Sequence, residues 1–144
     1  MRIDIYIKSS VKTLKRLNGT VGFVLEAEGY EGDTITQFGV VKNVTDNQSQ
    51  LLALKFALIR IRDKSNLVIH TDNRHIAAAF SQGWINTWKE NDFKNAKGKE
   101  VANAGEWREV LNLLGDNIPE FDFEDHSYSQ WLTQEVERRA KKYV

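Results

Sequence analysis

The 144-residue sequence contains no cysteine and a single proline, Pro119. Without cysteine, disulfide bonds and thiolate metal sites are excluded. No apolar run approaches the length of about 20 residues that a membrane-spanning helix needs, and the N-terminus lacks the charged-then-apolar plan of a secretory signal. These absences predict a cytoplasmic protein that does not associate with a membrane.

An excess of charge of one sign is also missing, because 20 lysines and arginines balance 20 aspartates and glutamates. The whole molecule therefore has no net field that would attract a nucleic acid, and any such binding has to come from a local patch. The length and an apolar content of 41% are typical of an ordered globular protein. We expect one domain over residues 1–144.

Alternating apolar residues predict a first strand over residues 2–8. Its apolar face carries Ile3, Ile5 and Ile7, and its other face carries Asp4, Tyr6 and Lys8. Two further strands, 20–29 and 33–43, flank the turn-prone segment YEGD, so we expect three consecutive antiparallel strands.

From residue 47 the apolar period becomes helical, and the segment VTDNQ offers candidate N-caps. The remaining pattern predicts a buried strand over 66–71, a short helix from 73 and a tryptophan-bearing segment over 84–93. It then predicts a helix over 103–115 that ends on Gly115, a strand over 120–125 and a last helix over about 130–142. This order is typical of an α/β fold.

Several spaced motifs resemble bacterial type 1 ribonuclease H. The basic, tryptophan-rich stretch GWINTWKENDFKNAKGKEVANAGEW (83–107) resembles the protrusion of that family, and NQSQLLALKFAL (47–58) and HTDNRHI (70–76) resemble two of its other motifs. The resemblance implies a ribonuclease H-like fold: a five-stranded mixed sheet, with the first three strands antiparallel and helices on both faces. Family members cut the RNA strand of an RNA–DNA hybrid with two magnesium ions held by four carboxylates.

The four carboxylate positions of the family are only partly kept in this chain. By the resemblance they fall on Lys8, Gln50, Asp72 and Glu137. Two-metal chemistry needs clustered anionic oxygens, whereas these four side chains sum to a charge of about minus one at neutral pH. We therefore interpret Asp72 and Glu137 as the remnant of a degenerate active site without a metal, in which Lys8 pairs either with Asp72 alone or with both carboxylates.

Three further residues near this site have an expected role. Asp4 lies four strand residues before Lys8, roughly 13 Å away, so it cannot share an ion with that position. It is expected either to pair with an outer-face lysine or to be a solvated charge at the end of the strand. His70 is expected to point to the face opposite Tyr6 or into the packing of the sheet. His126, one place before the family's loop histidine, is either its substitute or an ordinary loop residue.

Nucleic-acid binding can remain where cleavage is lost, because the protrusion has a net charge of +2 over residues 83–99 with interleaved aromatic side chains. Asn47 matches a family position that contacts 2′-hydroxyls in the RNA minor groove, although its neighbour Asp46 would repel a phosphate. The predicted nucleic-acid-binding residues are Asn47, Trp88, Lys89, Lys94 and Lys97. The alternative is that the aromatic residues pack the protrusion onto the domain and the lysines are only solvated.

The sequence thus favours a ribonuclease H-like domain that has lost two-metal hydrolysis, needs no cofactor, and acts as a non-catalytic nucleic-acid-binding or protein-interaction module. The partner would be an RNA–DNA hybrid or another nucleic acid, bound weakly, or an unidentified protein. The alternative is an active hybrid-specific ribonuclease with a rebuilt site for magnesium or manganese. A third hypothesis is a purely scaffolding role without nucleic acid.

Overall fold

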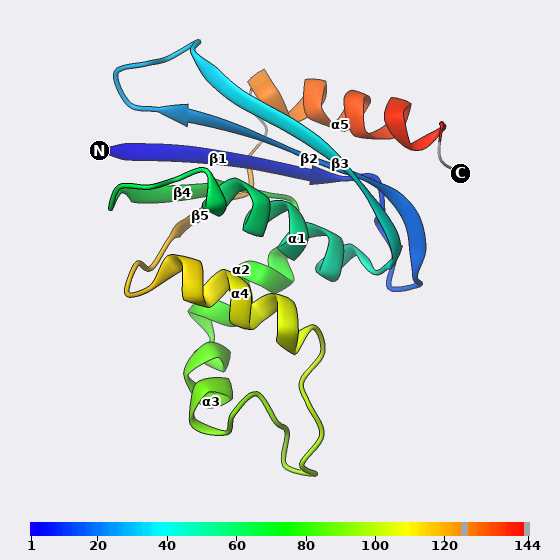
Figure 1. The fold of residues 1–144 in the computed structure, drawn as a ribbon, viewed down its shortest axis with the longest axis vertical. Helices are drawn as coiled ribbons and strands as arrows, with labels where there is room; N and C mark the ends of the chain where they lie inside the picture. The colour runs from blue at the N-terminus through cyan, green and yellow to red at the C-terminus, as the bar shows by residue number, and fades with distance from the viewer. Residues whose placement is uncertain (125–126, 143–144) are drawn as a thin grey trace.

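The computed structural model describes residues 1–124 and 127–142 and forms one five-stranded mixed sheet with helices on both faces (Figure 1). The elements, in chain order, are β1 Arg2–Ser9, β2 Leu17–Ala27, β3 Thr34–Val44, α1 Asp46–Ile59, β4 Asn66–His70, α2 Arg74–Ser81, α3 Trp84–Glu90, α4 Ala104–Leu114, β5 Glu120–Asp122 and α5 Ser127–Ala140. The strand order is β3-β2-β1-β4-β5. β1, β2 and β3 pair antiparallel, and β4 is parallel to both β1 and β5, as the fold prediction required.

The two faces of the sheet are covered by different helices (Figure 1). α1 packs on β1 and β2 on one face and contacts α4 on its outer side, while α5 packs on the other face of the same two strands. The large core on the α1 face includes Trp107 of α4, which is 1% exposed. A smaller cluster of Tyr6, Val24 and Leu132 lies under α5.

β1 shows why the alternating pattern of its sequence has functional consequences. Ile5 and Ile7 are fully buried against the α1 face, and Tyr6 is buried on the α5 face. The predicted strand register is therefore confirmed, and the outward face of this strand is itself covered by a helix. Lys8 lies on that second face at the C-terminal end of the strand, with 13% of its side chain exposed.

Local hydrogen bonds set the element boundaries where the sequence was least informative. Thr45 is the N-cap of α1, and its side chain accepts a hydrogen bond from the backbone N–H of Gln48, so α1 begins at Asp46. β5 ends at Asp122, before the end of the predicted strand 120–125. The Asp122 side chain accepts a hydrogen bond from the backbone N–H of Glu124, which forms a turn after the strand. None of the helices within residues 1–124 and 127–142 combines the length and apolar character that crossing a bilayer requires.

Candidate functional site

The site predicted from the sequence lies where β1 and β4 end beside the first turns of α1. Lys8 comes from β1, Asp72 follows β4, and Gln50 projects from α1. The Lys8 Nζ lies 3.5 Å from Asp72 Oδ2, and Gln50 Nε2 donates a hydrogen bond of 3.0 Å to Asp72 Oδ1. The predicted ion pair between Lys8 and Asp72 is therefore present, and both carboxylate oxygens of Asp72 face a donor.

A second lysine, which the sequence did not place here, approaches the same carboxylate. Lys12, in the loop after β1, brings its Nζ to 3.8 Å from Asp72 Oδ2. Lys8 is largely shielded from solvent, whereas the Asp72 side chain is 44% exposed. Two ammonium groups thus compete for one oxygen of a half-exposed carboxylate, which leaves this corner of the site without surplus negative charge.

The buried amide of Gln50 is fixed by its neighbours. Gln50 is 2% exposed, and its Oε1 accepts a hydrogen bond of 3.1 Å from the Thr71 hydroxyl. This contact directs the Nε2 group to the carboxylates, at 3.0 Å from Asp72 Oδ1 and 3.4 Å from Asp46 Oδ1. A neutral donor is what this position needs, because a glutamate here would place a third anion between two carboxylates.

Asp46 belongs to the group of side chains around Asp72, whereas from the sequence it was expected only to repel a phosphate. Burial raises the pKa of Asp46, and the charge of Asp72 adds to this rise, against opposing hydrogen bonds from Gln50 and Asn73. Its position four residues before Gln50 on one helix was the available signal, because residues spaced by four share a helix face. The site therefore contains Lys8, Lys12, Asp46, Gln50 and Asp72.

Glu137 was predicted as the fourth member of the site. It is exposed on α5 and lines an open hollow with Arg16 and Lys141. In the part of the chain that the structure describes, Glu137 has no hydrogen bond or ion pair to Lys8, Gln50 or Asp72, and no three His, Asp or Glu side chains are grouped so that they could hold a metal ion.

Asp4 and His70 form a separate group under α5. Asp4 Oδ1 lies 2.9 Å from Arg2 Nη2 and 2.7 Å from His70 Nε2, and the imidazole stacks on Tyr6 with ring centroids 4.2 Å apart. Asp4 is thus paired, but with an arginine and a histidine where the sequence predicted a lysine or a solvated charge. Of the two expectations for His70, the one that it faces away from Tyr6 is wrong, because the two residues are partners in parallel strands and so share a face. The other, that it lies in the packing of the sheet, is confirmed, because His70 is 7% exposed. His126 lies outside the described residues.

The predicted nucleic-acid-binding residues of the protrusion divide into a packed and an exposed set. Trp88 packs against Trp107 and Phe93, with ring centroids 5.3 and 6.4 Å away, so it anchors the protrusion to the core. Lys94 lies in a short bridge opposite Glu100, and the exposed lysines of the protrusion are Lys89, Lys94, Lys97 and Lys99. The aromatic residues therefore support a surface on which the lysines are displayed.

Asn47, the remaining predicted nucleic-acid-binding residue, lies beside the site and not on the protrusion. Its Oδ1 accepts a hydrogen bond of 2.7 Å from Asn73 Nδ2, and Asn73 is the buried N-cap of α2. Asn47 is half-buried at the start of α1, next to Asp46. Its side chain is therefore held in place before any ligand binds.

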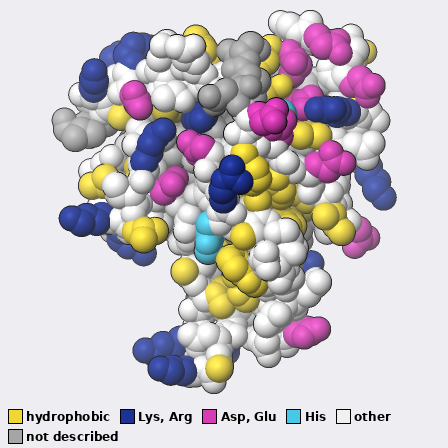
Figure 2. Space-filling model, turned by 180° about the vertical axis from the view of Figure 1, so that it is seen from behind, with side chains coloured by type: hydrophobic (Ala, Val, Ile, Leu, Met, Phe, Trp, Pro, Cys, Tyr) yellow, Lys and Arg dark blue, Asp and Glu magenta, His cyan; other side chains and the backbone are white. Residues whose placement is uncertain are grey.

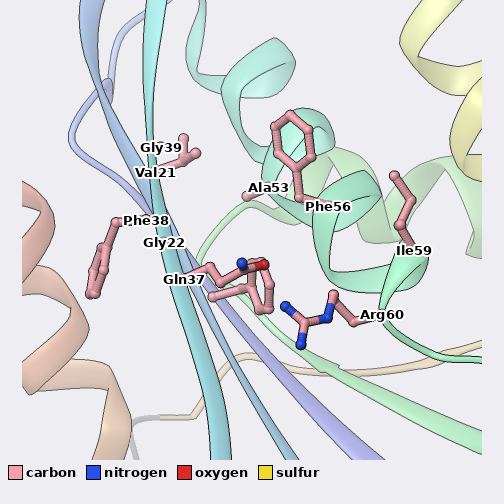
Figure 3. A pocket seen from close by; sticks show the side chains of 10 residues that line it. Val21, Gly22, Gln37, Phe38, Gly39, Ala53, Phe56, Ile59 and Arg60 are labelled. Carbon is pink, nitrogen blue, oxygen red and sulfur yellow. The ribbon is translucent and has the colours of Figure 1, made fainter.

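An apolar hollow of about 330 Å³ lies elsewhere, between α1 and strands β2 and β3 (Figure 3). Phe56 and Ile59 of α1 border it on one side and the edge strand on the other, and Arg60 is the one charged residue in its lining. It contains none of the residues around Asp72, so it is not part of the candidate site.

The sheet order, the covering helices and the residues gathered where β1, β4 and α1 meet define a ribonuclease H-like α/β domain. The family model described as RNase H matches residues 3–121. The chain belongs to the RNase H family, and the resemblance found in its sequence is confirmed.

Relatives support this membership at moderate identity. A Ribonuclease H of Caldicellulosiruptor saccharolyticus is 31% identical over 85 residues, which are 59% of this chain and 59% of that protein. The match thus spans about three fifths of the relative's length. Two solved structures share the fold. RNase H1 of Halobacterium salinarum NRC-1 has a TM-score of 0.64 and 14% identity, and the match covers both chains in full. The foamy viral protease-reverse transcriptase in complex with an RNA/DNA hybrid has a TM-score of 0.65 and 15% identity, and the match covers 98% of this chain and 19% of that chain.

Proposed function

We propose that this protein is a ribonuclease H-like module that binds nucleic acid without hydrolysing it. The observation that carries the proposal is the ammonium of Lys8, 3.5 Å from Asp72 at a position where the family has a carboxylate. A fixed positive charge occupies the space in which hydrolysis by this family would require a metal ion.

The residues at the site do not fit a pair of magnesium ions. Such a pair needs several anionic oxygens close together, because the two cations repel each other. Here the charges of Asp46 and Asp72 are balanced by those of Lys8 and Lys12, Gln50 is neutral, and Glu137 lines a different hollow. We infer that Lys8 and Lys12 do the neutralisation that metal ions do in the family.

Nucleic-acid binding is supported by the protrusion, which displays its lysines on an aromatic base, and by the pre-positioned amide of Asn47. The foamy viral relative in fold was solved with an RNA/DNA hybrid, and we extend that class of ligand to this chain. Because the net charge is zero, we expect weak binding that depends strongly on salt.

One assay separates this proposal from active cleavage. Labelled RNA–DNA hybrid is incubated with the protein in magnesium and in manganese, and the same hybrid is titrated in a mobility-shift series from low to high salt. We expect a salt-dependent shift and intact RNA. Cleavage that disappears in the Asp72→Asn variant would overturn the proposal, and the absence of a shift with hybrid, duplex and single strands would favour a scaffolding role.

Active hybrid cleavage at a rebuilt site is the second candidate, since the relatives carry the name Ribonuclease H and Asp46 adds a carboxylate beside Asp72. Calorimetric titration with magnesium distinguishes the two. We expect no stoichiometric site at millimolar magnesium. A site that is lost on Asp72→Asn would support the second candidate.

A further inference from the structure

The neutral chain carries its charges in separate regions. The loop segment 12–16 contains three basic residues and no acidic one, and segment 138–142 contains four and none, whereas segments 17–41 and 109–137 contain no lysine or arginine at all. In Figure 2 basic side chains gather along the left edge of the view and acidic ones at the upper right. A molecule without net charge thus has a basic side that is able to attract anions.

The two basic segments meet in space. The β1–β2 loop and the last turn of α5 line the same open hollow of about 740 Å³, to which Arg16, Asn18, Asn43, Glu137 and Lys141 contribute. The hydroxyl of Thr20 on β2 donates a hydrogen bond to the backbone carbonyl of Val136, which fixes α5 to the sheet beside this hollow.

The basic groups here differ in how they are held. Arg16 Nη1 donates hydrogen bonds to the Asn43 carbonyl at 3.1 Å and to Gln48 Oε1 at 3.0 Å, so neutral acceptors position the guanidinium without an anionic partner. Arg138 and Arg139 are different, because both pair with Glu135.

Three lysines provide the exposed part of this surface. Lys15, Lys141 and Lys142 are exposed and have no ion pair within residues 1–124 and 127–142. Lys12 continues the basic side to the candidate site through its contact with Asp72. Gln48 also connects the loop to α4, because its Nε2 donates a hydrogen bond of 2.8 Å to Glu106 Oε1.

We propose that the β1–β2 loop and the C-terminal end of α5 form a second phosphate-binding surface for the backbone of a nucleic acid, which we call the loop–helix surface (Lys12, Lys15, Arg16, Lys141 and Lys142). This inference rests on the proposed nucleic-acid binding and assigns part of it to elements outside the protrusion. A fixed arginine beside flexible, exposed lysines suits phosphates, which arginine recognises by directed hydrogen bonds and lysine as a point charge.

Glu137 gives the proposal a test in the opposite direction. It is the anion in the lining of the hollow and is exposed, so it repels a phosphate bound between Arg16 and Lys141. Glu137→Gln is therefore expected to tighten binding several-fold, while loss of the surrounding lysines weakens it.

The experiment measures dissociation constants for RNA–DNA hybrid, duplex DNA and single-stranded RNA by fluorescence anisotropy at several salt concentrations. The test variant is Lys15→Gln/Lys141→Gln/Lys142→Gln. The matched control is Arg60→Gln/Arg62→Gln/Lys64→Gln, which removes the same charge from exposed positions before β4, at the opposite end of the sheet. We expect the salt slope to fall by about one unit per lysine removed in the test variant and to change little in the control.

The outcomes separate this inference from the proposed function. Equal losses in both triple variants would mean that only overall charge matters, and the loop–helix surface would be refuted. If Lys94→Ala/Lys97→Ala weakens binding but the test variant and Glu137→Gln do not change it, the protrusion binds alone and only this inference fails. If the wild-type protein binds none of the three ligands, both fail.

Discussion

At the scale of single residues, the group around Asp72 shows how a carboxylate can be satisfied entirely by the protein. Lys8 and Lys12 face one of its oxygens and the Gln50 amide faces the other. Thr71 orients that amide from behind. We therefore expect the charges of this site to act on stability, which can be measured directly.

Reversing the charge of Lys8 should restore the repulsion that its ammonium removes. We expect Lys8→Asp to lower the free energy of unfolding in chelator by about 1–3 kcal/mol, because it places a largely shielded carboxylate beside Asp72. Thermal unfolding checks this, with Lys8→Met as the control that removes charge without reversing it. The double variant with Gln50→Glu should lose more and should recover part of the loss in magnesium. A Lys8→Asp protein as stable as wild type in chelator would show that Lys8 does not neutralise Asp72.

Asp46 makes a pH-dependent contribution of opposite sign to that of a paired carboxylate. Its pKa is raised in the folded protein by burial and by Asp72, so at neutral pH the folded state carries an unfavourable charge that is relieved as the pH falls through that raised pKa. Asp46→Asn should therefore raise the melting temperature at pH 7. It should leave the melting temperature unchanged near pH 3, where Asp46 is protonated in both the folded and the unfolded protein. Melting curves at the two values test this, and an equal change at both would assign the effect to packing.

At the scale of elements, the protrusion combines a packed base with a charged tip. Trp88 and Phe93 connect it to Trp107 in the core, and Arg108 of α4 lies over the Phe93 ring at 4.9 Å and hydrogen-bonds to the Asp92 carbonyl. The lysines beyond this base are therefore displayed by a rigid support. This arrangement predicts that their removal affects binding and leaves folding intact.

Removing Lys94 and Lys97 together should weaken binding of RNA–DNA hybrid and reduce its salt slope by about two units, one for each phosphate contact. Mobility shifts at several salt concentrations measure the slope. Thermal unfolding of the same Lys94→Ala/Lys97→Ala variant is the control and should be unchanged, since both side chains are exposed. An unaltered slope would mean that these lysines are only solvated charges.

At the scale of the whole molecule, one core connects nearly every element. Trp107 of α4 is buried in the same cluster as Ile5 and Ile7 of β1 and Leu51 and Leu54 of α1. α5 closes the other face over Tyr6 and Val24. Segments from both ends of the sequence therefore depend on the same sheet, which favours a single cooperative unit over residues 1–144.

We expect urea unfolding to show one transition. Tryptophan fluorescence, which reports on the packing around Trp107, should coincide with far-ultraviolet circular dichroism, which reports on all helices and strands. Two separated midpoints would show that the protrusion or α5 unfolds independently and would contradict the expectation of one domain.

The sequence by itself determined the sheet, the family and the pairing of Lys8 with Asp72. The single strands follow from their periodicity, because a strand alternates its faces every residue and a shift by one would expose its apolar side. The family, the five-stranded sheet and the pair of Lys8 with Asp72 follow from the resemblance of several spaced motifs to type 1 ribonuclease H. Only the tertiary structure decided the contacts made by loops and by the rotation of helices. It brought Lys12 to Asp72, partly buried Asp46 beside Gln50, and placed Glu137 in the lining of a hollow that Arg16 and Lys141 also line. It also set His70 against Tyr6, since the registry of two strands from distant segments depends on the packing of the entire sheet.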